Sequence, residues 1–477
     1  MRRERTFRLE RDSLGEREVP LGAYYGIQTL RASENFRISG LRAPRVFVRA
    51  TGAVKLAACR ANSSLGLLEK RIAGAISKAA EEVIEGRLDS EFIVDVFQAG
   101  AGTSHNMNAN EVIANRAIEI LGGKKGGYGL VHPNDHVNMG QSTNDTMPTA
   151  LRIAALWESS RLIDALGCLE AALRAKSREF RNVIKSGRTH LQDAVPVTLG
   201  QEFGSWAAAV KSSRNRIEQA RKGLKRIGLG GTAVGTGMNT HPGYRDRALR
   251  ELSKAGGIKG LRKAEDPFEA LNSFTDFSSL SGALRDAALD LIRIANDLRL
   301  LSSGPMTGLA EIKLPPVQPG SSIMPGKVNP VMAEMMDMAG FQVIGADAAI
   351  AAATQAGQLE LNVMLPVIGH NLLHSMDILS NAALAFSERC VKGIKADTGR
   401  CRRYFEASGG LATALNTLIG YEGAAEVVKE SMKTGKTIKE TALGKGILTG
   451  PEWDRLLDPK RITRPAVAPV KKRRTGR

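Results

Sequence analysis

The sequence contains few aromatic side chains and few cysteines. Only 5% of its 477 residues are Phe, Trp or Tyr, a content better suited to packed helices than to a β-sandwich. The four cysteines, Cys59, Cys168, Cys390 and Cys401, are dispersed and form no C-x-x-C pair, which argues against a disulfide framework and a zinc site. We therefore expect them to be small core residues in a reducing compartment, and the cytoplasm fits.

A signal peptide and a long hydrophobic run are also missing. The opening MRRERTFRLERD is charged where a secretory signal needs an apolar core. The most apolar stretch, VIGADAAIAAA, contains Asp347 and consists mostly of alanine. The sequence thus predicts neither export nor membrane insertion. With 43% hydrophobic residues, a chain of this length is expected to form a globular protein of two or three domains.

Acidic residues are absent from the C-terminal segment KRITRPAVAPVKKRRTGR, which carries eight Lys and Arg residues of a chain whose net charge is +18. Such a tail is either a solvated, disordered extension or an arm that binds nucleic acid or another polyanion. We favour the extension, because the segment has no aromatic residue for base stacking. The remaining basic excess would help to attract a small dianionic substrate.

Helical periodicity is the strongest pattern in the chain. In LSGALRDAALDLIRIANDLRL, apolar residues recur at steps of three or four, which predicts a long helix over residues 283–303. Similar patterns run through TALRIAALWESSRLIDALGCLEAALRAKSREF and from residue 331 to about 393. Alternating strand patterns and βα crossovers are scarce, so we expect an all-α protein built on a bundle of long helices.

Shifts in composition near residues 142 and 398 suggest how the chain is divided into domains. We expect a mainly helical N-terminal domain over 1–142, a long-helix bundle over 143–397, a small helical domain over 398–459 and a basic tail over 460–477. No internal repeat is evident.

Two glycine-containing segments resemble nucleotide-binding loops but have the wrong pattern. In GSSIMPGKVNP, five residues separate Gly320 from Gly326, and Val328 follows Lys327, so the segment is not a P-loop. The segment GLGGTAVGTGMNT, at 228–240, follows a helical pattern rather than a strand, so we interpret it as a turn between helices.

A metal site is a further alternative. His370 and His374 are four residues apart and share one helical face, as in zinc metalloproteases. Because Asn371 follows His370, there is no H-E-x-x-H motif, and we interpret both as ordinary helix-surface or interface histidines. We predict no metal.

Four polar segments far apart in the sequence cluster neutral hydrogen-bonding residues. Taken singly, such clusters are usually helix caps and turns. Together they resemble the aspartase/fumarase superfamily, and the resemblance extends from ERDSLGEREVP near the start to TALNTLIGYEGAAE at 413–426. The segments are GAGTSHNMNAN at 100–110, GQSTNDTMPT at 140–149, GRTHLQDAVPVTLGQEF at 187–203 and GSSIMPGKVNP at 320–330. The last is highly specific to this superfamily.

Within the superfamily, AYYGIQTLRASENF, HLQDAVP and QAGQLELNVM are similar to aspartate ammonia-lyases, whereas TALNTLIGYE is equally similar to class II fumarases. The resemblance implies reversible anti elimination of ammonia from L-aspartate to give fumarate, with class II fumarate hydratase as the alternative. A non-catalytic, polyanion-binding member of the fold is a third possibility. Met306 departs from an arginine usual in both enzymes, and Leu365 from a charged residue common there.

The resemblance also implies roles for individual residues. Ser321 would be the general base, and Glu334 would orient His190. The other residues would bind substrate: Thr103, Ser142, Thr143 and Ser322 the carboxylate that becomes a dianion, Thr189, Lys327 and Asn329 the second carboxylate, and Asn144, with His190, the departing amino group. Oriented neutral donors of this kind can stabilise an aci-carboxylate in the manner of an oxyanion hole, so no cofactor is expected.

The family fold implied by the resemblance has three largely helical domains. Its central helices come from four subunits and form one bundle, and each active site combines segments from three subunits. We therefore expect a homotetramer that acts on a small dicarboxylate and does not contact membranes.

Overall fold

The computed structural model describes residues 6–465. Most of them are helical, which confirms the prediction of an all-α protein. The strands in this part of the chain are short and pair two by two. Three pairs are antiparallel, namely β1 (Phe7–Asp12) with β2 (Gly15–Pro20), β3 (Ile184–Thr189) with β4 (Gln192–Thr198), and β7 (Ile312–Lys313) with β8 (Lys395–Ala396). The pair β5 (Arg226–Ile227) and β6 (Arg262–Lys263) is parallel.

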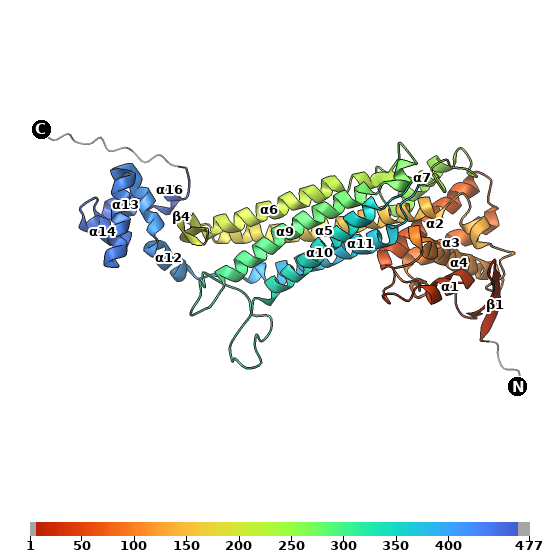
Figure 1. Ribbon diagram of the computed structural model, residues 1–477, viewed down its shortest axis with the longest axis horizontal. Coiled ribbons are helices and arrows are strands. Elements are labelled where there is room, and N and C mark those ends of the chain that lie inside the picture. Colours follow the sequence, from red (N-terminus) through yellow and green to blue (C-terminus); the bar gives the residue numbers. More distant parts are fainter. Residues whose placement is uncertain (1–5, 466–477) are drawn as a thin grey trace. The chain divides into compact units, whose positions relative to one another are not determined.

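Five helices of 22 to 37 residues are drawn in Figure 1. They are α5 (Thr143–Glu179), α6 (Leu199–Ala220), α9 (Thr275–Leu301), α10 (Val331–Gln355) and α11 (Leu365–Arg389). The periodicity predicted α9 correctly, because Leu284, Leu291 and Leu298 are all buried. The helix begins before residue 283, since a single glycine at 282 is tolerated inside a helix. The pattern from residue 331 onward consists of two helices.

The chain forms two compact units. Unit 1 comprises residues 1–164, 213–288 and 340–380, and unit 2 comprises residues 165–212, 289–339 and 381–477. Each unit contains a segment of each of the five long helices. The division into three domains predicted from the sequence remains a prediction.

Unit 1 also contains shorter helices, from the N-terminal part of the chain and from residues 244–272. These are α1 (Ile27–Asn35), α2 (Arg45–Ser64), α3 (Lys70–Glu85), α4 (Thr103–Ile120), α7 (Tyr244–Gly256), α8 (Glu269–Asn272) and a π-helical turn, Pro133–Val137. Ile76 and Val83 on α3 and Ile113 on α4 are fully buried in one hydrophobic core. The helices α2 and α3 pack closely at Gly52, where an added Cβ would lie 3.0 Å from the Val83 side chain.

Unit 2 also contains the short helices of the C-terminal part. These are α12 (Thr398–Ala407), α13 (Asn416–Thr434), α14 (Ile438–Gly444), α15 (Gly450–Leu456) and α16 (Pro459–Ile462). Leu415, Val427 and Trp453 are buried in a second core. The predicted basic tail starts within α16, and its remainder from residue 466 lies outside the described residues.

Two expectations from composition can be compared with the structure. Cys59, Cys390 and Cys401 are buried, as expected, but Cys168 on α5 is exposed, so the prediction of a core position was wrong for this residue. It lies on the outward face of α5 together with Asp164, Ala171 and Ala175, which are also exposed. Between residues 6 and 465, no helix is long and apolar enough to cross a membrane.

Candidate active site

Both units contain residues assigned to the site by sequence. Unit 1 holds Thr103, Ser142, Thr143 and Asn144, and unit 2 holds Thr189, His190, Ser321, Ser322, Lys327, Asn329 and Glu334.

Thr103 is the first residue of α4. The chain enters this helix through a tight turn in which Ala101 has φ of 60° and Gly102 has φ of 84°. The Thr103 hydroxyl donates a hydrogen bond to the carbonyl of Gly100 at 3.1 Å. The side chain is exposed and lines a cavity of about 600 Å³ together with His132. A hydroxyl at a helix start, facing a cavity, is accessible to a ligand.

The polar segment that ends in Asn144 opens α5, and Asp145 fixes its conformation. One carboxylate oxygen of Asp145 accepts the Ser142 N–H at 2.9 Å, and the other accepts the N–H groups of Gly230 at 2.8 Å and Thr232 at 3.0 Å. Asp145 is fully buried, and this burial raises its pKa to about 6.

The glycine-rich loop 228–240 therefore holds the start of α5. The prediction that this segment does not follow a strand was wrong, because the two-residue strand β5 directly precedes it. The Asn144 amide also donates to the carbonyl of Ala233 at 2.7 Å. Sequence reasoning did not select Asp145, although an aspartate in the first turn after a Ser-Thr-Asn run is a recognisable helix-start signal.

Thr143 has a hydroxyl whose donor function is available. Its oxygen accepts a hydrogen bond from the Asn106 amide nitrogen at 3.0 Å. A threonine hydroxyl has one hydrogen to donate, and within residues 6–465 no acceptor takes it. Thr143 can therefore donate to a bound carboxylate.

Thr189 and His190 lie at the tip of the β3–β4 hairpin. Thr189 pairs with Gln192, so His190 and Leu191 form a two-residue turn, and their φ angles are 54° and 60°. Positive φ at both positions is the geometry of a type I′ turn, which asparagine and glycine normally occupy. Both side chains are exposed. The hairpin thus presents its tip in a conformation that the surrounding structure has to impose.

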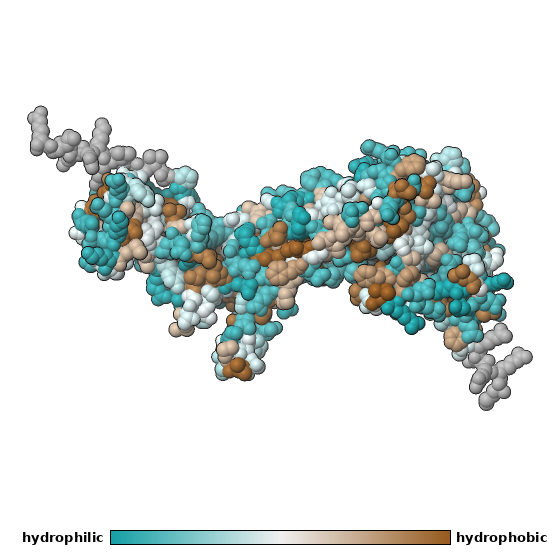
Figure 2. All heavy atoms as spheres, in the orientation of Figure 1, coloured by the Kyte–Doolittle hydropathy of each residue, from teal (hydrophilic) through white to brown (hydrophobic). Residues whose placement is uncertain are grey.

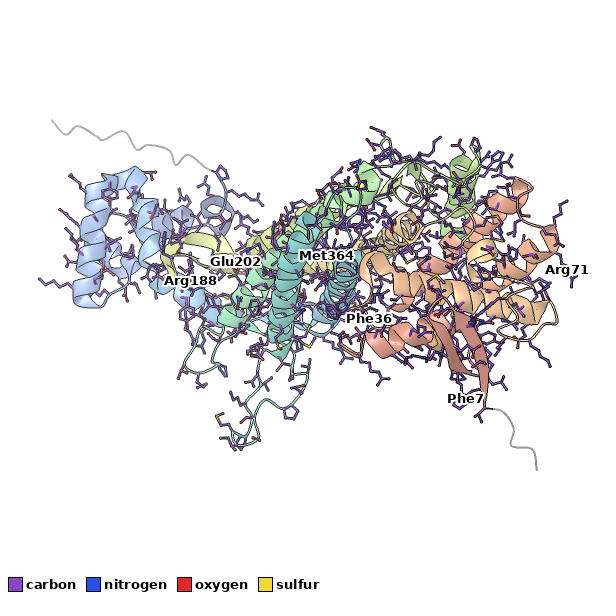
Figure 3. All side chains as sticks on the ribbon, turned by 45° about the vertical axis from the view of Figure 1, so that its right-hand side comes forward. Phe7, Phe36, Arg71, Arg188, Glu202 and Met364 are labelled. Atoms are coloured by element: carbon purple, nitrogen blue, oxygen red, sulfur yellow. The ribbon has the colours of Figure 1, made fainter. Side chains whose placement is uncertain are left out.

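A buried ionic network, which we call the hairpin network, lies at the root of this hairpin. It consists of Lys185, Arg188, Glu202 and Glu311. Arg188 donates to both oxygens of Glu311 at 3.0 and 3.1 Å. Lys185 lies 3.0 Å from Glu311 and 2.7 Å from Glu202, and the side chains of Lys185 and Glu311 are 1% and 0% exposed. Figure 3 labels Arg188 on β3 and Glu202 on α6, near one another. None of these four residues was assigned to the site from the sequence.

The loop 320–330 between α9 and α10 is closed at its base. The Gly320 N–H donates to the Lys327 carbonyl at 2.9 Å, and the Asn329 amide donates to the Gly320 carbonyl at 2.7 Å. Only glycine fits at 320, since an added Cβ would lie 2.3 Å from that Lys327 oxygen. Asn329 therefore shapes the loop, and Lys327 is exposed on it.

The tip of this loop is exposed and hydrophobic. The Ile323 side chain is 82% exposed, and Met324 and Val328 are also exposed. Figure 2 shows hydrophobic atoms in brown at the end of the segment that projects between α9 and α10. Exposed apolar side chains of this kind are suited to covering a bound ligand when a loop closes.

Ser321 is held at the start of the same loop. Its hydroxyl oxygen accepts the backbone N–H groups of Met324 at 2.9 Å and Ile323 at 3.2 Å. This is the geometry of a serine turn, the structural alternative to a catalytic role. The same two donors point at the atom that would carry the negative charge of an alkoxide, so they also favour the deprotonated form.

Glu334 lies in the first turn of α10 and is half-buried. Within the described residues, it forms no hydrogen bond with His190. The resemblance implies sites assembled from several subunits, so the pairing of these two residues stays a prediction about the assembly.

The two histidines considered as metal ligands stack on one another. The rings of His370 and His374 lie 5.9 Å apart at an angle of 4°, and Phe97 lies beside His370. Over residues 6–465, no group of three His, Cys, Asp or Glu residues is placed to hold a metal ion. Of the two departures from the family pattern, the Met306 side chain is 85% exposed and Leu365 is buried at the start of α11.

Known proteins resemble this chain over nearly its whole length. Residues 15–345 match the family described as Lyase, and residues 411–464 match the family described as Fumarase C C-terminus. Aspartate ammonia-lyase from Bacillus sp. is 48% identical, covering 97% of this chain and 98% of its own. Fumarate hydratase class II from Halobacterium salinarum is 51% identical, covering 96% and 97%.

Solved structures are similar to the same extent. A fumarate lyase:delta crystallin from Brucella melitensis superposes with a TM-score of 0.93 at 50% identity, covering 96% of this chain and all of its own. A class II fumarase from Schistosoma mansoni gives a TM-score of 0.91 at 37% identity, covering 96% and 99%. The long-helix fold and the polar loops thus define an enzyme of the lyase class. The chain belongs to the aspartase/fumarase superfamily, which confirms the resemblance drawn from the sequence.

Proposed function

We propose that this protein is an aspartate ammonia-lyase, which reversibly eliminates ammonia from L-aspartate to give fumarate. The reaction is an anti elimination through an aci-carboxylate intermediate. A weakly acidic proton must leave the carbon next to a carboxylate, which concentrates two negative charges on one carboxyl group. Preorganised neutral donors lower the free energy of that dianion.

The observation that carries the proposed chemistry is the geometry of Ser321. A free serine is a poor base because its alkoxide is unstable in water. Here the backbone N–H groups of Ile323 and Met324 already point at the hydroxyl oxygen, and Lys327 lies on the same loop. Closure of the loop would remove water and strengthen both effects. Ser321 would then take the proton from the carbon.

The remaining residues would bind and orient the substrate. Thr103, Ser142, Thr143 and Ser322 donate to the carboxylate that becomes the dianion, and Thr189, Lys327 and Asn329 bind the other carboxylate. Asn144 and His190 lie at the departing amino group, and Glu334 orients His190. The free donor of Thr143 supports its assignment. The local hydrogen bonds of Asn329 and Asn144 support a role in shaping the site as well as in contact with substrate.

These residues come from both units, and the site would be completed in a homotetramer in which segments of three subunits meet. The pairing of His190 with Glu334 belongs to that assembly. We propose that the enzyme is cytoplasmic. Its reaction needs no cofactor.

L-Aspartate is favoured as the substrate by three stretches, AYYGIQTLRASENF, HLQDAVP and QAGQLELNVM. The 48% identity with an aspartate ammonia-lyase supports it. Class II fumarate hydratase is the second candidate, because relatives with that activity are 50% and 51% identical. Both reactions use the same dicarboxylate frame and the same base, so the leaving group alone separates them.

The test supplies L-aspartate, L-malate and D-aspartate separately to the purified enzyme and follows the absorbance of fumarate. We expect L-aspartate to be converted, L-malate to be a poor substrate and D-aspartate to be inert. Turnover of L-malate far above that of L-aspartate would establish the hydratase instead. No fumarate from any of the three acids would favour a non-catalytic member of the fold.

A further inference from the structure

Lys55 on α2 is a fully buried lysine with no carboxylate partner. Its side chain is 0% exposed, and its amino group donates to the amide oxygens of Asn138 at 2.9 Å and Gln141 at 3.0 Å. Within residues 6–465, it forms no ion pair. Lysine is almost never fully buried without a charged partner, because desolvating an ammonium group is costly. Such a residue is expected to have a function that offsets its cost in stability.

The two hydrogen-bond acceptors of Lys55 connect it to residues of the candidate site. The oxygen of Asn138 also accepts from the Asn106 amide nitrogen at 3.3 Å, and that same nitrogen donates to the Thr143 hydroxyl oxygen at 3.0 Å. Gln141 immediately precedes the 142–144 segment, and its own amide donates to the Val137 carbonyl at 2.9 Å. A chain of hydrogen bonds therefore runs from Lys55 through Asn138 and Asn106 to Thr143.

The orientation of Asn106 is costly in itself. This residue is 1% exposed, and its amide oxygen is buried without a hydrogen-bond partner among the described residues. A buried amide would normally turn to satisfy its oxygen. If Asn106 did so, its oxygen would face Thr143 and accept the threonine O–H, and that donor would be lost to a substrate. Something has to hold Asn106 in the observed orientation.

We propose that Lys55 is the positioning residue that sets this orientation and so keeps the Thr143 hydroxyl available to the substrate carboxylate. The inference rests on the proposed role of Thr143. The ammonium form of Lys55 can only donate, so it fixes the Asn138 oxygen toward itself and Asn106. Because that oxygen can only accept, the Asn106 nitrogen has to face it. The same nitrogen donates to the Thr143 hydroxyl oxygen, so the Thr143 hydrogen stays free to donate elsewhere.

The arrangement functions in either protonation state of the amine. Burial lowers the pKa of Lys55 to about 7, and the nearby His105, also buried, has its pKa lowered to about 3 and stays neutral. A neutral amine retains two N–H donors, and Lys55 has two amide acceptors. Both forms can thus donate to Asn138 and Gln141, and the ammonium form, which cannot accept, also excludes the reverse orientation of the Asn138 amide.

A double-mutant cycle tests this chain. The variants are Lys55→Met, Thr143→Val and the combination, and the measurements are fumarate affinity by calorimetry and kcat/KM. Each single substitution should weaken fumarate binding about tenfold or more, the loss of one good hydrogen bond to a charged group. The double variant should bind about as weakly as Thr143→Val, because both changes remove one donor. Losses that multiply would overturn the proposal.

Two further variants separate positioning from folding. Lys176→Met removes another buried lysine, which donates to the Ile394 carbonyl and pairs with Glu179, and it should leave fumarate affinity unchanged. If Lys55→Met fails to fold, Asn138→Leu can replace it, because it removes the next residue in the same series of hydrogen bonds. Its loss should also be non-additive with Thr143→Val, and an additive loss or none would again overturn the proposal.

Fumarate is common to the aspartate and malate reactions, so the cycle does not depend on which acid is the substrate. A wild-type protein that neither binds fumarate nor turns over either acid would overturn the proposed function and this inference together. Multiplicative losses in an active enzyme would overturn the inference alone.

Discussion

Glu311 offers the clearest test of how the tip of the β3–β4 hairpin is held. Its carboxylate is 0% exposed and lies against two cations, Lys185 at 3.0 Å and Arg188 at 3.0 Å. The substitution Glu311→Gln keeps the size of the side chain and removes its charge. Lys185 and Arg188 are then left with Glu202 as the only carboxylate of the hairpin network.

The expected loss in the free energy of unfolding follows from the burial of the Glu311 carboxylate. Removing one partner of a buried ion pair costs about 3–5 kcal/mol, and the lower end applies because Lys185 keeps Glu202 at 2.7 Å. We therefore expect Glu311→Gln to lower the free energy of unfolding by about 3 kcal/mol. Because the hairpin presents Thr189 and His190, kcat/KM should fall as well.

Urea unfolding, followed by circular dichroism, and steady-state turnover provide the assay. Glu202→Gln is the matched control. The Glu202 side chain is 25% exposed, and of the two cations it forms an ion pair with Lys185 and not with Arg188. This substitution should cost only about 1 kcal/mol, because Glu202 is partly exposed and Lys185 keeps its buried partner Glu311 at 3.0 Å. Unchanged unfolding of Glu311→Gln, or a larger loss in the control, would refute this explanation of the hairpin.

Three other predictions concern the turn, the buried lysine and the C-terminal segment. Leu191→Gly should raise the free energy of unfolding by about 1 kcal/mol, because glycine adopts positive φ without strain; a loss of stability in urea unfolding would contradict the type I′ assignment. Burial lowers the pKa of Lys55 from 10.5 to about 7, although the charge of Asp145 acts to raise it, so the unfolded state binds more protons between those values. Stability of the wild type relative to Lys55→Met should therefore rise with pH across this window, by at most about 1.4 kcal/mol per pH unit, and parallel stability profiles would be inconsistent with this. Deletion of residues 466–477 should leave turnover unchanged, since the assigned residues all precede them; lost turnover with assembly preserved would place the segment in the site.

The long helices were predictable because their signal is local. A stripe such as Leu284, Leu291 and Leu298 on α9 is visible within one stretch of sequence, and its burial is what the periodicity implies. The β3–β4 hairpin gave no such signal. Asparagine and glycine at the two turn positions would have predicted a type I′ turn, but the sequence has His190 and Leu191 there. The surrounding tertiary structure therefore overrides the local preference of these two residues.

The supporting residues of the site were missed because their partners are distant in sequence. Lys55 lies 83 residues from Asn138, and Glu311 lies 123 residues from Arg188. Nothing next to either residue indicates its partner. The residues selected from the sequence were those in polar loops, whereas the buried ions and amides that hold these loops are recognisable only from their contacts.

Ser321→Ala tests the central claim most directly. The substitution removes the proposed base and leaves Thr143, Thr189 and Lys327 to bind the two carboxylates. We predict that turnover of L-aspartate falls by several orders of magnitude while fumarate affinity, measured by calorimetry, changes only a few-fold. The neighbouring Ser322→Ala should instead raise KM, because that hydroxyl is assigned to binding. Near-normal turnover in Ser321→Ala would contradict the assignment of Ser321 as the base.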